Sequence, residues 1–486
     1  MRQTFTFALL TLLLIGGACT EDDPETTILV TEEVLFASGE QLRILGRLIT
    51  NQSINADDHG FYLARDESFS NPILISLGPK EGPGRFIGET SGLNTGETYF
   101  VKAFMDLGSG PEFGNVIEVE TLNPGIESFT PNFGKENEEL FILGRNFTSD
   151  TRVFFGDQEA EILDISFESR LTVRIPSPTS SSTAEIKVVV KEDELVFSET
   201  FEYQIGTYEQ IGIYPETVKL YDNVSWKNGS NFFMGLGAER RTSFYEKIFR
   251  YNPSENLWDE INFPGSLRSL AFATANYLGG GIRELGRDPF LLNRSFWRFD
   301  GSEFTQLADL PFDSRESVAF EISNQLYVIG GKEGNPQEVR KYNPSTGSWS
   351  ILADAPEAIS DELVHFTYQN KEYFIFSSGE VLAFEPVSGT WVSVSNYPGT
   401  LGQGYGFAEV IGDKVYVGAY RRTLEMWEFD LTKLSWKRKN DLPGITQNIN
   451  VGHFTYNGGV YFLRVTEQAP IGANSMSFYR FNPEGI

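Results

Sequence analysis

Basic and aromatic side chains in the C-terminal half of the chain are the residues whose types could bind a ligand. They follow or lie between short β-rich runs, and they are Arg240, Arg241, Arg283, Lys332, Tyr405, Tyr420, Arg421 and Arg422. A guanidinium group donates two parallel hydrogen bonds to a carboxylate, sulfate or phosphate, and a tyrosine ring can stack on a sugar. These residues therefore predict a site for a glycan or another ligand with an acidic group.

The same cations have acidic neighbours, and this leaves a second interpretation open. Three further arginines, Arg268, Arg315 and Arg464, are expected in the same region, and carboxylates such as Glu239, Glu316 and Glu425 lie close to these cations in the sequence. Ion pairs at a solvated surface would also explain the pattern, and such pairs contribute little to stability.

Catalytic and metal motifs are absent from the sequence. It contains no Gly-x-Ser-x-Gly, no phosphate-binding Gly-rich loop, no His-Glu-x-x-His and no calcium loop. Of the three histidines, His365 and His453 open the same tetrapeptide, His-Phe-Thr-Tyr. Their equivalence predicts a packing role in a repeat, although a metal-binding pair is the alternative. The sequence thus predicts no cofactor and no metal site, and it favours binding over catalysis.

A repeated pair of aromatic residues indicates which elements must position these side chains. Each pair is followed by a proline, and the five copies are Tyr251/Trp258/Pro264, Phe299/Phe304/Pro311, Tyr342/Trp349/Pro356, Phe384/Trp391/Pro398 and Phe429/Trp436/Pro443. Four short strands with their turns fill one such repeat. A sixth copy is divided, because Phe481 lies near the end of the chain and Tyr208 with Pro215 lies far before it. The division predicts a ring closed by strands from both ends of the region.

This pattern resembles the kelch repeat over residues 205–486. Double glycines follow β-rich runs, as in Tyr327-Val328-Ile329-Gly330-Gly331, where they are expected to let inner strands approach an axis. The chain departs from the pattern at Phe304, Ser377 and Phe462. The resemblance implies a six-bladed β-propeller with its candidate ligand site at the channel mouth. Two unrelated sandwiches are the alternative, but they would not predict the divided copy.

The resemblance to kelch propellers extends to two classes of enzyme. A copper radical oxidase similar to galactose oxidase needs a cysteine in the propeller, and Cys19 is the only cysteine of the chain. A sugar mutarotase or epimerase of the kelch sialate type needs no cofactor and binds an acidic sugar with arginines, so it stays an alternative to non-catalytic binding.

Two smaller β-rich segments precede the repeats. Residues 28–122 resemble a fibronectin type III-like module, because Tyr99 follows a turn and opens an alternating strand, as in a tyrosine corner. Residues 123–204 resemble an IPT/TIG domain, through Ile142-Leu143-Gly144-Arg145-Asn146-Phe147 and Val153-Phe154-Phe155-Gly156. Glycine and asparagine there are expected in turns with positive φ. Both modules are predicted to be spacers without a ligand site.

The N-terminus has the pattern of an export signal. Residues 1–18 contain one basic residue, an apolar run too short to span a bilayer, and small residues before Cys19. This resembles the bacterial lipobox, which implies cleavage before Cys19 and a lipid on its sulfur. In the acidic tether, residues 19–27, the run Thr20-Glu21-Asp22-Asp23 is similar to the surface-export signal of Bacteroidota lipoproteins. A signal cut after Ala18 that leaves a free cysteine is the alternative.

Charge and composition limit the partners. The net charge of −28 repels the phosphates of nucleic acids and anionic membrane surfaces. The sequence therefore predicts an all-β protein with two immunoglobulin-like sandwiches and a six-bladed kelch-type propeller, bound to the outer membrane only through Cys19. Its expected function is to bind a glycan or a partner protein in nutrient uptake or adhesion. A structural scaffold for protein interactions is the other non-enzymatic alternative, and it would show a large apolar patch and no polar pocket.

Overall fold

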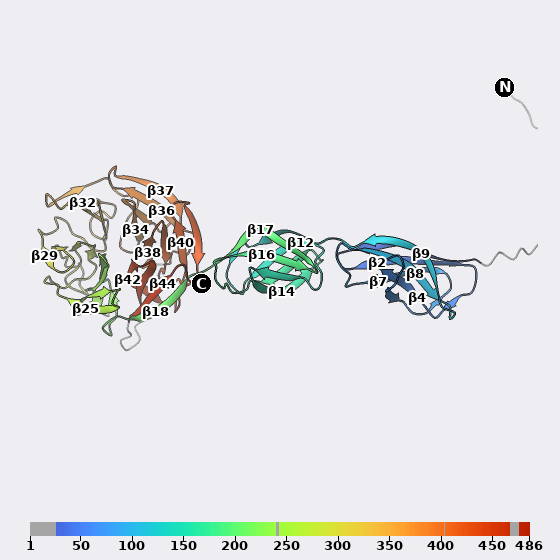
Figure 1. The fold of residues 1–486 in the computed structure, drawn as a ribbon. Helices are drawn as coiled ribbons and strands as arrows, with labels where there is room; N and C mark the ends of the chain where they lie inside the picture. Colours follow the sequence, from blue (N-terminus) through green and yellow to red (C-terminus); the bar gives the residue numbers. More distant parts are fainter. Residues whose placement is uncertain (1–25, 240–242, 403, 467–475) are drawn as a thin grey trace, which may run out of the picture. The chain divides into compact units, whose positions relative to one another are not determined.

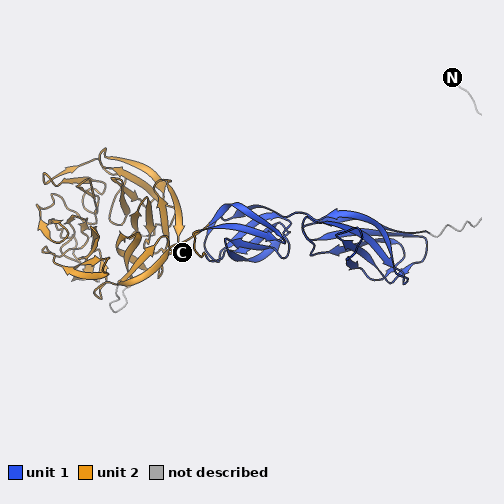
Figure 2. Ribbon diagram, in the orientation of Figure 1, with its two compact units in different colours: residues 1–177, 183–201 blue, residues 178–182, 202–486 orange. Residues whose placement is uncertain are grey.

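Strands joined by turns make up the part of the chain that the structure describes. In this computed structural model these are residues 26–239, 243–402, 404–466 and 476–486, and no helix occurs in them (Figure 1). No helix that could cross a membrane is therefore found among the described residues. The chain divides into two compact units, residues 1–177 with 183–201 and residues 178–182 with 202–486 (Figure 2). The all-β class predicted from the sequence is confirmed.

The first part of unit 1 is a β-sandwich. Its sheets are β1-β2-β7 (Thr27–Ala37, Leu42–Thr50, Gly84–Thr90) and β5-β4-β8-β9 (Ile73–Ser76, Asp58–Ala64, Thr98–Asp106, Pro111–Glu120), beside the short pair β3 (Asn55–Ala56) and β6 (Lys80–Glu81). Alternate side chains point inward, so that Ile44, Phe61 and Val101 are fully buried in a common core. The Tyr99 hydroxyl accepts a hydrogen bond from the Asn94 N–H at 3.1 Å, as the tyrosine-corner motif predicts.

The second part of unit 1 has eight strands in the order β10-β12-β15-β14-β13-β16-β17-β11. In chain order they are β10 (Gly125–Thr130), β11 (Phe133–Gly134), β12 (Glu139–Arg145), β13 (Arg152–Phe155), β14 (Gln158–Ser166), β15 (Arg170–Arg174), β16 (Thr183–Val190) and β17 (Asp193–Tyr203). Asn146 and Gly156 have φ of +55° and +58°, as expected for their turns. The residues that border the candidate site described below all belong to unit 2.

Unit 2 contains six four-stranded antiparallel sheets, and this arrangement is consistent with a kelch propeller. Five of them are continuous in sequence: β20-β21-β24-β25 (Val224–Asn228, Asn231–Gly235, Ile248–Asn252, Leu257–Ile261), β26-β27-β28-β29 (Phe272–Ala273, Tyr277–Gly279, Phe296–Phe299, Phe304–Gln306), β30-β31-β32-β33 (Val318–Ile322, Gln325–Ile329, Val339–Asn343, Ser348–Ile351), β34-β35-β36-β37 (Val364–Tyr368, Lys371–Ile375, Glu380–Glu385, Thr390–Asn396) and β38-β39-β40-β41 (Phe407–Ile411, Lys414–Gly418, Met426–Asp430, Ser435–Lys439). A small sheet, β19-β22-β23 (Leu220–Tyr221, Ala238–Glu239, Ser243–Phe244), accompanies the first of them.

The sixth sheet joins distant parts of the sequence. Its order is β18-β44-β43-β42, with β18 at Thr207–Ile213, β42 at Asn448–Tyr456, β43 at Gly459–Thr466 and β44 at Ser477–Asn482. Tyr208 of β18 is opposite Phe481 of β44, and their rings stack with centroids 4.6 Å apart. The closing sheet predicted from the divided repeat is therefore confirmed.

The repeated aromatic pairs are cross-strand neighbours in the outer two strands of each sheet. Their ring centroids lie 4.4–5.1 Å apart, and the pairs are Tyr251/Trp258, Phe299/Phe304, Tyr342/Trp349, Phe384/Trp391 and Phe429/Trp436. Aromatic pairs at this distance add about 0.5–1.5 kcal/mol each beyond their burial. The repeat thus serves to hold the outer strands together.

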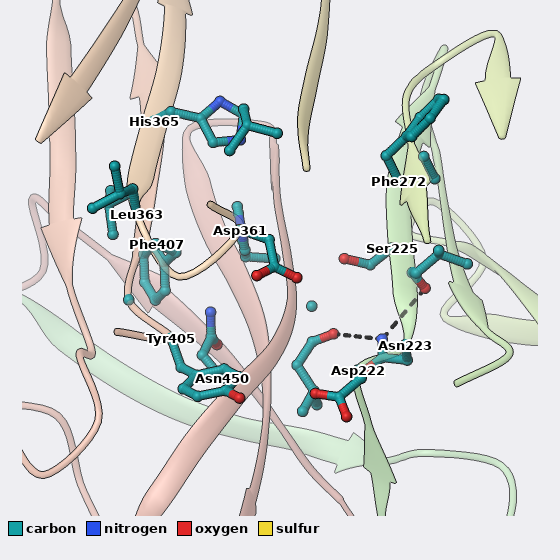
Figure 3. A pocket seen from close by; sticks show the side chains of 18 of the residues that line it. Asp222, Asn223, Ser225, Phe272, Asp361, Leu363, His365, Tyr405, Phe407 and Asn450 are labelled. Carbon is teal, nitrogen blue, oxygen red and sulfur yellow. Dashed lines mark hydrogen bonds between the residues drawn. The ribbon is translucent and has the colours of Figure 1, made fainter. Parts of the chain in front are cut away.

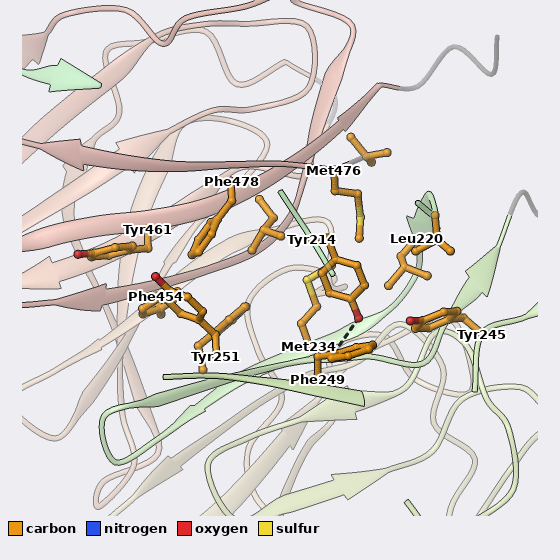
Figure 4. Packing of buried hydrophobic residues seen from close by; sticks show 14 of the residues in the cluster. Tyr214, Leu220, Met234, Tyr245, Phe249, Tyr251, Phe454, Tyr461, Met476 and Phe478 are labelled. Atoms are coloured by element: carbon orange, nitrogen blue, oxygen red, sulfur yellow. Dashed lines mark hydrogen bonds between the residues drawn. The ribbon is translucent and has the colours of Figure 1, made fainter. Parts of the chain in front are cut away.

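Each sheet also packs its face on the next sheet. Between the first sheet and the closing sheet, Tyr251 and Met234 meet Phe454, Tyr461 and Phe478 in one core (Figure 4). These residues are at most 8% exposed. Similar cores join each sheet to the next and the last sheet to the first, and the first strand of every sheet borders a common cavity.

The double glycine has a different role from the one expected. Gly330 and Gly331 follow β31 with φ of +62° and +96°, so both lie in the left-handed region that favours glycine. A Cβ on Gly330 would come within 2.2 Å of the Ile359 carbonyl oxygen. The glycines therefore allow a tight turn beneath the segment that leads to the next sheet.

Candidate functional site

A cavity of about 250 Å³ lies at the centre of unit 2. It is bordered by residues of the first strand of all six sheets, which are β20, β26, β30, β34, β38 and β42, and of the turns before them. Figure 3 shows Asp222, Asp361, Tyr405 and Asn450 around it. Because these strands are at the edges of their sheets, they also present unpaired backbone groups to the cavity.

The turns that lead into the first strands, here called the inter-sheet turns, are linked to one another. The Leu270 N–H donates to the Asp222 carbonyl at 3.0 Å, and the Glu316 N–H donates to the Leu270 carbonyl at 3.1 Å. The Asp361 N–H then donates to the Glu316 carbonyl at 3.0 Å. This series of hydrogen bonds passes through four successive sheets, so it holds the polar side chains at one end of the cavity in fixed positions.

The inter-sheet turns are also conformationally strained. Asp222, Leu270, Glu316 and Tyr405 each lie two residues before a first strand, and each has φ between +51° and +59°. The left-handed region is unfavourable for residues with a Cβ, and such residues gather at ligand and active sites. Since the strain recurs at one end of the cavity, we take that end as the candidate site.

Asp361 is the most perturbed acid of this end. Its side chain is exposed to the cavity but has no hydrogen bond or ion pair among the described residues. Burial in the surrounding wall raises the pKa of Asp361 to about 7, and nearby carboxylates add to the rise, namely those of Glu316, Asp222 and Glu362. Lys332 opposes it.

Two amides and a phenol complete the polar surface. Asn450 is only 7% exposed, and its Oδ1 has no hydrogen-bond partner among the described residues. The Asn223 amide donates to the Val451 carbonyl at 2.8 Å and is therefore occupied. Tyr405 is half-buried, and burial raises its pKa to about 12. A buried amide oxygen without a partner is costly, and the Asn450 Oδ1 is such an atom in the wall of the cavity.

The two histidines line the cavity further along the first strands. Each ring stacks on a phenylalanine, His365 on Phe374 and His453 on Phe407. Their carboxylate partners differ, because His365 Nδ1 contacts Glu372 in its own sheet at 2.6 Å, whereas His453 Nδ1 contacts Glu409 of the preceding sheet at 2.6 Å. Both histidines thus have the packing role that their equivalence predicts, but each also contacts a carboxylate, and these carboxylates occupy different positions in the two sheets.

A metal site is not evident. Within residues 26–239, 243–402, 404–466 and 476–486, no group of three or more His, Cys, Asp or Glu side chains is placed to hold a metal ion.

The residues predicted from the sequence lie in different places. Tyr405 borders the cavity, and the Arg421 guanidinium is 6.0 Å from the centre of its ring. Lys332 lies 3.9 Å from Glu316, as the ion-pair interpretation predicts. Arg283 and Arg422 are exposed and do not border the cavity. Arg240, Arg241 and Cys19 lie outside the described residues.

Three of the expected mouth residues are buried instead. Tyr420 is 3% exposed and packs in the core between two sheets, where burial raises its pKa well above the ordinary value. Arg268 and Arg464 are at most 2% exposed, and burial lowers the pKa of each to about 10. Arg268 donates to backbone carbonyls such as Ser266 and to the Ser295 hydroxyl. These side chains support the sheets and do not face a ligand.

The described lining consequently differs from the basic mouth that was expected. It includes the carboxylates of Asp222 and Asp361 and the amide of Asn450, but no lysine or arginine among the residues that the structure describes. These three residues were not predicted, because the expected site rested on cations in the loops after the second strand and between the repeats. The available signal was the set of polar residues just before each first strand.

Comparison with known proteins agrees with this architecture. Residues 124–203 match the IPT/TIG domain. The chain also has a kelch-repeat region, with 23% identity over 249 residues to Kelch-like protein 35 of Mus musculus, covering 48% of this chain and 41% of that protein. It is 23% identical over 260 residues to an N-acetylneuraminate epimerase of Haemophilus influenzae strain PittEE, covering 48% and 67%. The chain thus spans about two-fifths of the length of the mouse relative.

Two solved structures are similar to parts of this chain. A structure of YjhT is 13% identical with a TM-score of 0.45 and covers 56% of this chain and 96% of its own. A protein of unknown function from Bacteroides thetaiotaomicron is 15% identical with a TM-score of 0.40 and covers 74% and 98%.

Proposed function

We propose that the six sheets are the blades of one propeller and that its central cavity binds a small hydroxyl-rich ligand, such as a sugar unit of a glycan, without catalysis. The observation that carries this proposal is the strained and hydrogen-bonded end of the cavity, which Asp222, Asp361, Tyr405 and Asn450 border. Sites for small ligands are concave and have a few polar groups fixed by a rigid scaffold.

The types of these side chains fit a sugar. Carboxylates accept hydrogen bonds from hydroxyl groups, and the Asn450 amide can both donate and accept. Tyr405 adds the flat apolar face on which a sugar ring can lie. The polar cavity also favours a small ligand over the structural scaffold, for which an apolar face without a polar pocket was expected.

The proposal includes a place for the protein. A lipid on Cys19, the acidic tether and the modules of residues 28–122 and 123–204 would present the propeller outside the outer membrane, as in surface lipoproteins of the Bacteroidota type. Binding of a glycan there would serve nutrient uptake or adhesion.

A glycan array tests the function directly. Full-length protein without its lipid is expected to bind one class of glycan, and Tyr405→Ala is expected to weaken that binding by about tenfold or more, since stacking and burial are lost. Tyr62→Ala is the matched control, because Tyr62 is also half-buried but lies in the first sandwich. Equal binding by all three proteins would remove the cavity as the site.

A second candidate function is that of a sugar mutarotase or epimerase, which inverts the configuration at one carbon of a sugar. Asp361 favours it, because an acid with a pKa of about 7 can both donate and accept a proton near neutral pH. The distant similarity to an N-acetylneuraminate epimerase agrees with this candidate. However, Asp222 and Asp361 would repel the carboxylate of an acidic sugar at this end of the cavity. Anomer exchange of N-acetylneuraminic acid, followed by NMR, should be accelerated if the candidate is right and unchanged if it is not.

A further inference from the structure

We propose that the cavity has a second subsite, where His365 and His453 accept hydrogen bonds from the hydroxyl groups of an uncharged sugar. The inference rests on the proposed binding function, and it names the residues and the chemical group through which the ligand would be recognised. The subsite lies further along the first strands than the end of the cavity that Asp222 and Asp361 border.

Histidine is not required at this position of a sheet. His365 and His453 each lie three residues before the last paired residue of their first strand. The corresponding residues of three other sheets are small and also border the cavity, and they are Ser225, Ala319 and Ala408. A small side chain is therefore enough to close a sheet against the cavity. Closure of the ring does not account for the two histidines.

Each imidazole ring is held by a carboxylate that does not itself border the cavity. His365 Nδ1 lies 2.6 Å from Glu372 Oε1. His453 Nδ1 lies at the same distance of 2.6 Å from Glu409 Oε1. Glu372 is fully buried, and its second oxygen accepts a hydrogen bond from the Thr367 hydroxyl. Because an ionised carboxylate can only accept, each neutral ring has its hydrogen on Nδ1 and its lone pair on Nε2.

The same contact is built in two different ways. Glu372 belongs to the second strand of the sheet that contains His365, whereas Glu409 belongs to the first strand of the sheet before that of His453. A repeat with unchanged contacts would give both histidines a partner at the same position. The difference indicates that the ring orientation fixed by the carboxylate is what matters here. Carboxylates orient histidines in this way where the other ring nitrogen contacts a substrate or a metal.

The second nitrogen of each ring is open to a ligand. Nε2 of His365 and Nε2 of His453 have no hydrogen-bond partner among the described residues, and neither belongs to the fully buried polar atoms without a partner. The two side chains are 32% and 34% exposed and border the cavity. Figure 3 shows the His365 ring projecting from its strand beside the cavity. Each ring can therefore accept one hydrogen bond from a donor in the cavity.

A hydroxyl group is the donor that fits these nitrogens. A carboxylate has no hydrogen to donate to a neutral ring, and it would also approach the negative charges of Glu372 and Glu409. A metal ion fits less well, because no group of three His, Cys, Asp or Glu side chains among the described residues is placed to hold one. An uncharged sugar brings several hydroxyl groups, so one molecule could supply donors to both rings.

Nitrogen-15 NMR tests the ring orientation without a ligand. The sample is full-length protein without its lipid, labelled at its three histidines, and each signal is assigned with a His→Gln variant. At about pH 8, where imidazole side chains are neutral, His365 and His453 are expected to carry their hydrogen on Nδ1. A hydrogen on Nε2 of either ring would overturn the inference, because that nitrogen could not accept a hydrogen bond.

Diethyl pyrocarbonate, which acylates accessible neutral imidazoles, tests the contact with a sugar. The probes are the methyl glycosides of glucose, galactose, mannose and fucose, together with any glycan found on the array. At about ten times its Kd, at least one probe is expected to slow modification of His365 and His453 by about tenfold, as read by mass spectrometry. His59 of the first sandwich is the internal control, because it lies outside the cavity and its rate should not change.

Substitution by alanine removes one acceptor at a time. His365→Ala and His453→Ala give each position the small side chain that other sheets have there, and each is expected to weaken binding of the protecting sugar about threefold to tenfold. Tryptophan fluorescence during urea unfolding verifies that each variant is folded. His453→Ala is the safer of the two, because its partner Glu409 is less buried than Glu372. His59→Ala should bind as the unmodified protein does.

The outcomes separate the inference from the function on which it rests. A sugar that binds through Tyr405 but leaves both cavity histidines open to modification would overturn the inference and keep the binding function. Protection by Zn²⁺ and by no sugar would overturn it in favour of a metal. No binding by any probe, together with no Tyr405-dependent glycan on the array, would overturn both.

Discussion

Removal of the Phe481 side chain tests whether the closing sheet holds unit 2 together. Phe481 of β44 is fully buried, stacks on Tyr208 of β18 at 4.6 Å and meets Tyr416 of the preceding sheet edge-on at 5.8 Å. A Phe→Ala change in such a core costs about 3–5 kcal/mol through lost transfer energy and the cavity left behind. We therefore expect Phe481→Ala to lower the free energy of unfolding of unit 2 by that amount.

Part of this loss should depend on Tyr208. Stacked aromatic rings contribute about 0.5–1.5 kcal/mol beyond their burial, so Tyr208→Ala and Phe481→Ala should be non-additive by a similar amount in a double-mutant cycle. The control is Phe374→Ala, because Phe374 is equally buried but lies in a sheet that is continuous in sequence. It should cost about as much, and its effect should add to that of Tyr208→Ala.

Tryptophan fluorescence during urea unfolding is a selective assay, because all seven tryptophans lie between Trp226 and Trp436 and hence in unit 2. The unfolding of unit 1 does not contribute directly to this signal. A loss below about 1 kcal/mol for Phe481→Ala, or strict additivity with Tyr208→Ala, would show that pairing of the chain ends does not stabilise the ring as argued.

Three further predictions follow from single side chains. The raised pKa of Asp361, about 7 against an ordinary 3.8, means that the folded state keeps a proton that the unfolded state has lost between these values. Its contribution therefore makes stability fall as pH rises from about 4 to about 7, and Asp361→Asn should flatten this fall in unfolding midpoints measured across that range. Glu372→Ala should lower the free energy of unfolding by about 3 kcal/mol in the fluorescence assay, because a fully buried carboxylate accepts hydrogen bonds from His365 and Thr367 that would lose their acceptor; a neutral result would mean that these groups reach water instead. Cys19→Ser should prevent incorporation of an alkyne-tagged fatty acid in living cells, and labelling that persists would refute the proposed lipid anchor.

The architecture could be predicted from the sequence because the residues that build it repeat. Tyr251 and Trp258 recur as a pair in sheet after sheet, since every sheet must join its outer two strands in the same way. The divided copy was predictable for the same reason, because Tyr208 needs a partner and Phe481 provides it. Tyr99 was predictable from a local motif whose hydrogen bond lies within a few residues.

Burial of a charged side chain was not predictable in this way. Arg268 and Arg464 were expected at the cavity mouth because they lie in the sequence where loops between repeats or after a second strand were predicted. Arg268 is nevertheless enclosed, since the carbonyls of Ser266, Gly280 and Ser295 and the Ser295 hydroxyl are placed around its guanidinium group. This arrangement depends on the three-dimensional path of several turns, and no spacing in the sequence reveals it.

The inter-sheet turns explain why the ligand chemistry was also missed. Asp222, Leu270, Glu316 and Tyr405 all lie two residues before a first strand, so they occupy corresponding places in four sheets, yet two are acidic, one is aliphatic and one is aromatic. The backbone hydrogen bonds between these turns use N–H and carbonyl groups, so the ring can close with almost any side chain there. Side chains at this position are therefore free to differ according to the ligand. It follows that Asp361 and its neighbours can be exchanged with a larger effect on binding than on folding, which is the opposite of what we expect for Phe481.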